Sequence, residues 1–258
     1  MKAIINLPLV PLRESDNERS EMYSQLLFGE CVEVIETRER WLFVRNLNDN
    51  YRGWVDRKMV QLISGHDEKL LQEIKKYKVQ VPLTVCVKTL SEEKMLLPGG
   101  SIIRTNKTDE FTLGDESFHV SSSDLAVEAE IDGQTVIQHA LQYLNAPYLW
   151  GGKSILGIDC SGLVQVVFSM FGTQLDRDAS EQVEIGLPID FLSEAKAGDL
   201  AFFENDNGKI IHVGLLLNSH QIIHASGWVK VESIDSNGII SSLTGEYTHK
   251  LRVIKRLI

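Results

Sequence analysis

Short alternations of apolar and polar residues fill the first part of the chain. Residues 30–35 and 41–45 alternate in this way between polar turns, and the segment Tyr-Arg-Gly-Trp-Val-Asp follows at 51–56. A period of two predicts half-buried strands, and several short strands at close spacing are typical of a small barrel. The pattern therefore predicts a first β-barrel over residues 1–63.

A second β-rich stretch follows a charged connector. Residues 64–78 are highly charged with a brief helical pattern, which favours a connector between domains. Beyond it, apolar runs at 79–87, 95–97, 102–105 and 118–120 are separated by polar breaks and by the turn Pro-Gly-Gly-Ser at 98–101. We predict a second small barrel over residues 79–124.

The pattern changes at about residue 125. Residues 136–144 have helical spacing, and residues 163–171 are nearly all apolar and too long for an ordinary strand. Strands are predicted afterwards at 199–203, 210–217, 221–225 and 250–257. The predicted fold class is thus α+β, with two small barrels in front of a domain over residues 125–258.

Charge and composition narrow the class of protein. The 36 acidic and 26 basic residues give a net charge of −10, and the basic residues form no cluster, so we expect no nucleic-acid partner. No run reaches the roughly 18 apolar residues of a membrane helix, and we expect no membrane partner. The apolar start is short and broken by Pro8 and Pro11, which indicates a first strand rather than a leader.

The three cysteines differ in their surroundings. Their odd number and wide spacing match neither a disulfide framework nor a zinc motif, which favours a reducing compartment such as the cytoplasm. We separately expect a monomer. Cys31 and Cys86 lie among apolar or β-branched residues and are interpreted as small buried side chains. Cys160 lies instead in Asp-Cys-Ser-Gly, at the start of a predicted helix.

The start of a helix favours a reactive thiol. Unpaired N–H groups and the positive end of the helix dipole stabilise a thiolate, so the pKa of Cys160 is predicted to lie below its free value of ~8.5. The same N–H groups, with Asp159 and Ser161 beside them, are candidates for contacts with substrate and with a developing oxyanion.

Two histidines on neighbouring predicted strands complete a candidate triad. Alternation puts His212 and Gly214 on one face of the first strand and His224 on a face of the next. If the turn between them has an odd number of residues, His224 lies opposite Gly214 and close to His212. Cys160 would attack, His212 would take and return the proton, and His224 would orient His212. A zinc site is disfavoured because this set is one structural ligand short, so no metal or other cofactor is predicted.

Several motifs together resemble the NlpC/p60 family of cysteine peptidases. The matching segments are Tyr-x-Trp-Gly-Gly at 148–152, Asp-Cys-Ser-Gly at 159–162, Gly-Asp-Leu at 198–200, His-Val-Gly at 212–214 and Ile-His-Ala at 223–225. The resemblance covers the chain from about residue 126 onward. It implies a papain-like domain, a catalytic set of Cys160, His212 and His224, and hydrolysis of peptidoglycan peptides.

The barrels in front resemble one branch of that family, the γ-D-glutamyl-L-diamino acid endopeptidases with SH3-like domains. This resemblance implies cleavage of murein peptides at the γ-D-Glu–diamino acid bond. It also implies that Glu21, Tyr51 and Asp178 hold the free amino group of an N-terminal L-Ala. A buried ammonium needs carboxylate and hydrogen-bonding partners to offset its desolvation, which these three side chains could supply.

Two other functions stay open at this point. Related papain-like folds pass the acyl group to an amine or lipid, which would make the protein an acyltransferase. A wall-binding protein with an inactive catalytic domain is the second alternative, which the intact Cys160, His212 and His224 disfavour. For the other histidines and for Trp150 a structural or surface role is predicted; these histidines are His66, His119, His139, His220 and His249.

Overall fold

The computed structural model describes residues 1–65, 71, 73–127 and 131–258. Its contacts divide the chain into two compact units, Met1–Ala129 with Ser169–Gln174, and Glu130–Phe168 with Leu175–Ile258. His66 and part of the predicted connector, residues 66–70 and 72, lie outside the described residues, as do residues 128–130. Each unit is described by itself below.

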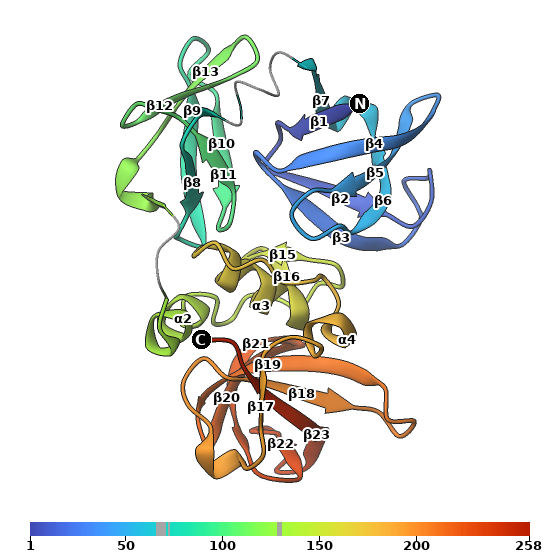
Figure 1. Cartoon of the computed structure of the whole chain (residues 1–258), viewed down its shortest axis with the longest axis vertical. Coiled ribbons are helices and arrows are strands. Elements are labelled where there is room, and N and C mark those ends of the chain that lie inside the picture. Colours follow the sequence, from blue (N-terminus) through green and yellow to red (C-terminus); the bar gives the residue numbers. More distant parts are fainter. Residues whose placement is uncertain (66–70, 72, 128–130) are drawn as a thin grey trace. The chain divides into compact units, whose positions relative to one another are not determined.

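The first unit opens with a seven-stranded antiparallel sheet (Figure 1). Its strand order is β3-β2-β6-β5-β4-β1-β7, and alternate side chains along the strands fill one core that includes Val10, Leu12, Val32 and Val44. The sheet occupies the residues for which a first barrel is predicted, 1–63, and its closure into a barrel stays a prediction. Its strands are β1 (Lys2–Ile5), β2 (Leu9–Arg13), β3 (Met22–Leu27), β4 (Cys31–Arg38), β5 (Trp41–Asn46), β6 (Arg52–Asp56) and β7 (Val60–Ile63), with a short 3-10 helix η1 (Arg57–Met59).

Two smaller sheets follow in the same unit. One has the order β10-β9-β13-β12 and the other β11-β8-β14, and they share a core to which Ile4 and Phe28 of the preceding part also belong. Whether this part is a second SH3-like barrel stays a prediction. Its elements are β8 (Lys76–Val79), β9 (Leu83–Lys88), β10 (Lys94–Pro98), β11 (Ile102–Arg104), β12 (Glu110–Leu113), β13 (Glu116–Val120), η2 (Ser122–Asp124) and β14 (Leu125–Ala126).

The apolar run at 79–87 is divided between two strands. The chain ends β8 at Val79 and begins β9 at Leu83. Pro82, which has no N–H to give to a ladder, lies in the break between them. β8 also begins at Lys76, inside the predicted connector.

The second unit combines helices with a closed sheet. Strand β23 pairs with β18 along one edge and, on the other, with β22 near its start and β17 at its end. Strands β18 to β23 thereby close into a six-stranded ring. They are β18 (Leu200–Glu204), β19 (Ile210–Asn218), β20 (Gln221–Ser226), β21 (Trp228–Ile234), β22 (Gly238–Ile240) and β23 (Tyr247–Arg256), with β15 (Lys153–Ser154), β16 (Gly157–Ile158) and β17 (Leu187–Ile189) outside the ring.

The first helix of this unit begins at a side-chain cap. In α2 (Gly133–Leu141) the Asp132 side chain accepts a hydrogen bond from the N–H of Thr135 at 2.7 Å. The apolar helix α3 (Cys160–Ser169) is buried along its length, and α4 (Ala179–Gln182) and η3 (Leu192–Glu194) follow. As predicted, Cys160 is the first residue of a buried helix.

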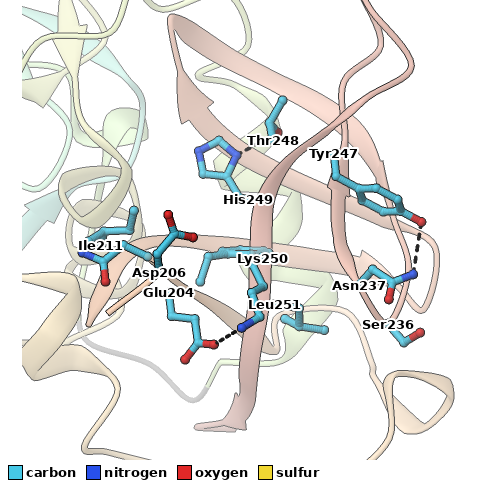
Figure 2. A pocket seen from close by; sticks show the side chains of 12 residues that line it. Glu204, Asp206, Ile211, Ser236, Asn237, Tyr247, Thr248, His249, Lys250 and Leu251 are labelled. Atoms are coloured by element: carbon cyan, nitrogen blue, oxygen red, sulfur yellow. Dashed lines mark hydrogen bonds and ion pairs between the residues drawn. The ribbon is translucent and has the colours of Figure 1, made fainter. Parts of the chain in front are cut away.

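A pocket of about 710 Å³ opens beside the ring, between the β18–β19 hairpin and the start of β23 (Figure 2).

None of the helices in the described part of the chain is long and apolar enough to cross a membrane.

Candidate active site

Cys160 is held by a rigid helix start. The Asp159 carboxylate accepts hydrogen bonds from the N–H of Gly162 at 2.7 Å and of Gly151 at 2.8 Å, and Arg177 binds both of its oxygens, at 3.1 and 2.6 Å. A side chain at position 162 would collide with the carbonyl oxygen of Gly152 and with Asp159 itself. The Asp-Cys-Ser-Gly motif thus forms a hydrogen-bonded cap at the start of the helix that carries Cys160.

The environment of Cys160 differs from the one predicted. Burial, and next the Asp159 carboxylate, raise the pKa of the Cys160 thiol to about 11, although N–H groups of Val213 and Ser161 and the charge of Arg177 act in the opposite direction. The prediction of a lowered pKa is therefore wrong for the resting enzyme, because desolvation outweighs the helix start. The contact with the Val213 N–H places the thiol beside β19, next to His212.

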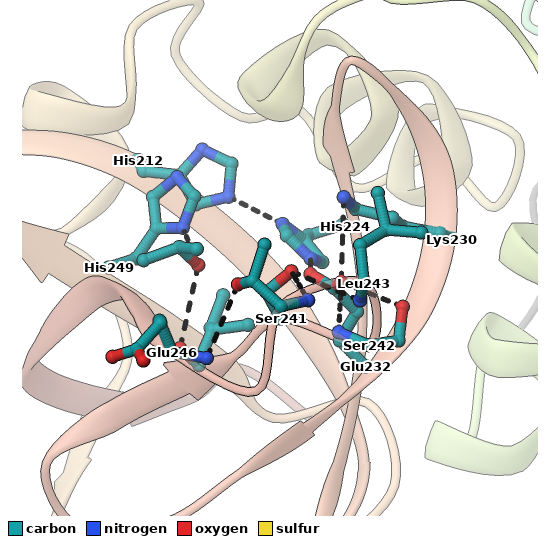
Figure 3. Close-up of polar contacts among 12 residues, drawn as sticks. His212, His224, Lys230, Glu232, Ser241, Ser242, Leu243, Glu246 and His249 are labelled. Atoms are coloured by element: carbon teal, nitrogen blue, oxygen red, sulfur yellow. Dashed lines mark hydrogen bonds and ion pairs between the residues drawn. The ribbon is translucent and has the colours of Figure 1, made fainter.

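His212 is the first member of a buried relay (Figure 3). The distance between His212 Nε2 and His224 Nδ1 is 2.9 Å, and His224 Nε2 lies 2.9 Å from Glu232 Oε2. The register that pairs Leu215 with Ile223 is the one predicted for an odd turn, and a side chain at Gly214 would collide with His224. The two histidines thus share a face, as alternation predicted.

The carboxylate of Glu232, at the end of the relay, determines which ring nitrogens of the two histidines carry a proton. Burial opposes the charge of Glu232, but the hydrogen bonds from His224 and Ser242 outweigh burial and lower its pKa to about 2. An ionised Glu232 can only accept, so His224 Nε2–H donates to it, and His224 Nδ1 in turn accepts from His212 Nε2–H. This tautomer leaves the lone pair of His212 on Nδ1, the nitrogen available to take a proton from Cys160.

His212 is a neutral base at rest. Burial first, then the neighbouring His249 and His224, lower the pKa of His212 well below 6.5. Before the reaction, therefore, the buried thiol is protonated and the buried imidazole is neutral. The proton moves from the sulfur to His212 when the sulfur attacks. Burial also raises the pKa of Tyr148 to about 12, next to Cys160 and Asp159, so that its phenol remains a hydrogen-bond donor.

No motif in the sequence indicates that His249 lies beside the base. Its ring stacks on that of His212 with 4.1 Å between centroids and 28° between planes, and its Nδ1 lies 2.8 Å from the Thr248 hydroxyl. Burial first, then His224, lower its pKa to about 4, so this neighbour is uncharged at neutral pH. The structure places His249 against the ring of His212, a neighbourhood that the sequence patterns do not predict.

The three histidines also raise the question of a metal. Their nearest ligand nitrogens lie within 4.8 Å of one another. A zinc ion would lie about 2.0 Å from each nitrogen and in the plane of each ring, but two stacked planes 28° apart do not meet that close to both rings. The geometry is that of a ring stack, and no step of the reaction is assigned to a metal.

Arg177 and Glu232 are further residues that the sequence reasoning missed. Arg177 is fully buried and binds the Ser161 hydroxyl at 2.9 Å as well as Asp159, so both predicted contacts are tied into the protein's own network. Asp178, the next residue, is half-buried at the start of α4. Neither missed residue belongs to a motif used above, although Glu232 shares its strand face with Lys230, which pairs with His224.

The other two predicted amine-binding residues lie in the first unit. Glu21 is exposed just before β3, and its carbonyl accepts from the N–H of Glu14 at 3.0 Å. Tyr51 is half-buried and packs against the core of the seven-stranded sheet. Their part in binding a substrate stays a prediction.

Comparison with known proteins decides the family. The profile of the NlpC/P60 family matches residues 145–251, which contain Cys160 and the histidine relay, and that of a bacterial dipeptidyl-peptidase SH3 domain matches residues 12–59. Residues 145–251 are therefore an NlpC/P60 domain. The chain is a cysteine peptidase, with an SH3 domain in front of this papain-like domain.

Relatives with similar length support this assignment. The chain is 29% identical to Dipeptidyl-peptidase 6 of Lysinibacillus sphaericus, over 91% of this chain and 92% of the relative. It is also 29% identical to a γ-D-glutamyl-L-lysine dipeptidyl-peptidase of Bacillus subtilis, over 78% of this chain and 71% of the relative. The crystal structure of an NlpC/P60 protein from Bacillus cereus has the same fold, with a TM-score of 0.87, 17% identity and 99% coverage of both chains.

Proposed function

We propose that this NlpC/P60 peptidase hydrolyses the bond between γ-D-Glu and the diamino acid of peptidoglycan peptides, and releases L-Ala-γ-D-Glu. The observation that carries the proposal is the relay from Glu232 through His224 to His212 beside the helix-start thiol. The names of the relatives from Bacillus subtilis and Bacillus cereus, which are γ-D-glutamyl-L-lysine dipeptidyl-peptidases, support this choice of bond.

The first half of the reaction forms a thioester. The Cys160 sulfur attacks the γ-carbonyl carbon of D-Glu while His212 Nδ1 takes the thiol proton, and N–H groups at the start of α3 face the developing oxyanion. When the C–N bond breaks, the His212 imidazolium gives that proton to the leaving amine of the diamino acid. The acyl group remains on sulfur.

The second half returns the enzyme to its starting state. Water enters the place of the departed amine, His212 takes one of its protons, and the oxygen attacks the thioester carbon. The C–S bond then breaks, and the sulfur recovers the proton from His212. The product is L-Ala-γ-D-Glu with a free γ-carboxylic acid.

Selection of the peptide's free end is part of the proposal. We assign the N-terminal ammonium of L-Ala to Asp178 together with Glu21 and Tyr51, because a desolvated ammonium requires anionic and hydrogen-bonding partners. A requirement for a free amine restricts the enzyme to peptides already separated from glycan. We accordingly propose that it works in the cytoplasm as a monomer on released murein peptides; sedimentation of the purified protein and fractionation of cells test these two points.

The decisive experiment uses the full chain and defined peptides. L-Ala-γ-D-Glu-L-Lys and its meso-diaminopimelate analogue are incubated with wild type and Cys160→Ala, and products are identified by mass spectrometry. Wild type should release L-Ala-γ-D-Glu, and both Cys160→Ala and N-acetylation of the peptide should stop turnover. Equal cleavage of the acetylated peptide contradicts the amine requirement, and transfer of the acyl group to an added amine in preference to water would identify an acyltransferase.

A further inference from the structure

The pocket beside the closed ring is lined partly by neighbours of the catalytic base. His249 and Phe203 both belong to its wall, and their rings lie 4.1 and 5.7 Å from the ring of His212. His212 delivers its proton to the leaving amine under the mechanism above. The pocket therefore shares part of its wall with the surroundings of the base that protonates the leaving amine.

The wall combines an apolar strip with polar groups. Ile211, immediately before the base, is 52% exposed although it is a large aliphatic residue in a strand, and it lines the pocket with Leu251. Tyr247 is 53% exposed, and its hydroxyl donates to Asp235. This pocket has both apolar contact area and hydrogen-bonding groups that can order a flexible ligand.

The two carboxylates of the pocket differ in their partners. Glu204 is paired with two cations, with Lys250 at 2.7 Å and with Arg252 at 3.3 Å. Asp206, at the tip of the β18–β19 hairpin, is exposed and makes no ion pair with any residue of the described part of the chain. Figure 2 shows Asp206, Ile211 and His249 together at one side of the pocket. A cationic group entering there could pair with the Asp206 carboxylate.

We propose that this pocket receives the side chain of the departing diamino acid, with its methylenes along Ile211 and its terminal ammonium paired with Asp206. The inference rests on the proposed function and adds to it a site for the leaving group. It predicts that a positive charge at the end of that side chain is recognised by the enzyme.

The test compares two peptides that differ only in this charge. L-Ala-γ-D-Glu-L-Lys and L-Ala-γ-D-Glu-L-norleucine share the straight side chain, but only the first carries the ammonium. Wild type should cleave the lysine peptide with a kcat/KM about fivefold higher, the size expected for one partly exposed ion pair. Asp206→Asn should remove that preference by lowering kcat/KM for the lysine peptide alone, and Asp206→Lys should reverse it.

A matched control separates this effect from a general loss of surface charge. Asp190 is an exposed acid of the same unit that does not line the pocket, so Asp190→Asn should leave both peptides unaffected. An unchanged lysine preference in Asp206→Asn, or equal loss on both peptides, overturns the pocket assignment while the peptidase function stands. If folded wild type cleaves neither peptide, the proposed function itself fails, and the pocket assignment fails with it.

Discussion

The two sides of the catalytic site handle charge in opposite ways. On the helix side, Asp159 and Arg177 form a fully buried ion pair that also binds Ser161 and the turn before Cys160. On the sheet side, the imidazoles of His212 and His249 are held neutral, and the relay ends at the carboxylate of Glu232. The ion pair holds Cys160 in place. The neutral imidazole of His212 can take a proton from Cys160 and return it.

The largest effect on activity is expected from removing the base, His212. His212→Ala should reduce kcat by at least ~10⁴-fold, because it removes the group that accepts the thiol proton. Peptide hydrolysis measures the loss, and the melting temperature should stay close to that of wild type. His220→Ala, at an exposed histidine of the same sheet, is the control and should keep full activity. Appreciable turnover by His212→Ala would contradict the assignment of the base.

Breaking the ion pair between Asp159 and Arg177 should mainly lower the stability of the protein. Arg177→Met leaves the Asp159 carboxylate buried without its partner and should lower the free energy of unfolding by roughly 3–5 kcal/mol. Denaturant titration measures this change. The double variant Asp159→Asn with Arg177→Met should recover part of the loss, because no unpaired charge remains; a double variant less stable than Arg177→Met would argue that the pair acts mainly through its hydrogen bonds.

Reversing the direction of the hydrogen bonds from His212 through His224 to Glu232 should lower kcat by an intermediate factor. In Glu232→Gln the side-chain amide can donate to His224 Nε2, which moves the His224 proton to Nδ1 and the His212 proton to the nitrogen that should act as base. We expect kcat to fall by about 10²-fold, as a wrong tautomer disables a catalytic imidazole. Steady-state kinetics measure the fall, with the exposed Glu246→Gln as the control. A kcat within twofold of wild type would show that Glu232 does not set the tautomer.

The smallest expected effect is a pH dependence of stability. The pKa of His249 is about 4 in the folded protein against 6.5 for the free group, so between these values the unfolded chain binds a proton that the folded one does not. Stability should therefore fall as pH decreases from 6.5 to 4, with His249 contributing on the order of 1–2 kcal/mol. His249→Phe, which keeps a ring against His212, should make the slope shallower, and unfolding titrations at several pH values measure it. An unchanged slope would contradict a neutral buried His249.

The parts of the site that the sequence predicted are those set by local pattern. The start of α3 at Cys160 follows from the transition to a continuous apolar run, and the pairing of His212 with His224 follows from alternation across one turn. Glu232 and His249 were missed because their places depend on how strands β21 and β23 pair, which alternation along one strand does not reveal. The pKa of Cys160 was predicted in the wrong direction because the sequence shows where a helix begins but not how deeply its first turn is buried.

The closure of the ring also bears on how the site is assembled. Strand β18 pairs with β23, whose residues lie about fifty positions later in the chain, so the ring cannot close until this long-range pairing forms. Because contacts of high sequence separation slow folding, β23 is expected to dock late, after the β19–β20 hairpin has brought the two relay histidines together. The enzyme would then become able to hydrolyse peptides only after β23 has docked. Until that point a newly made chain would carry Cys160 without the stacked imidazoles of His212 and His249, and it would be inactive.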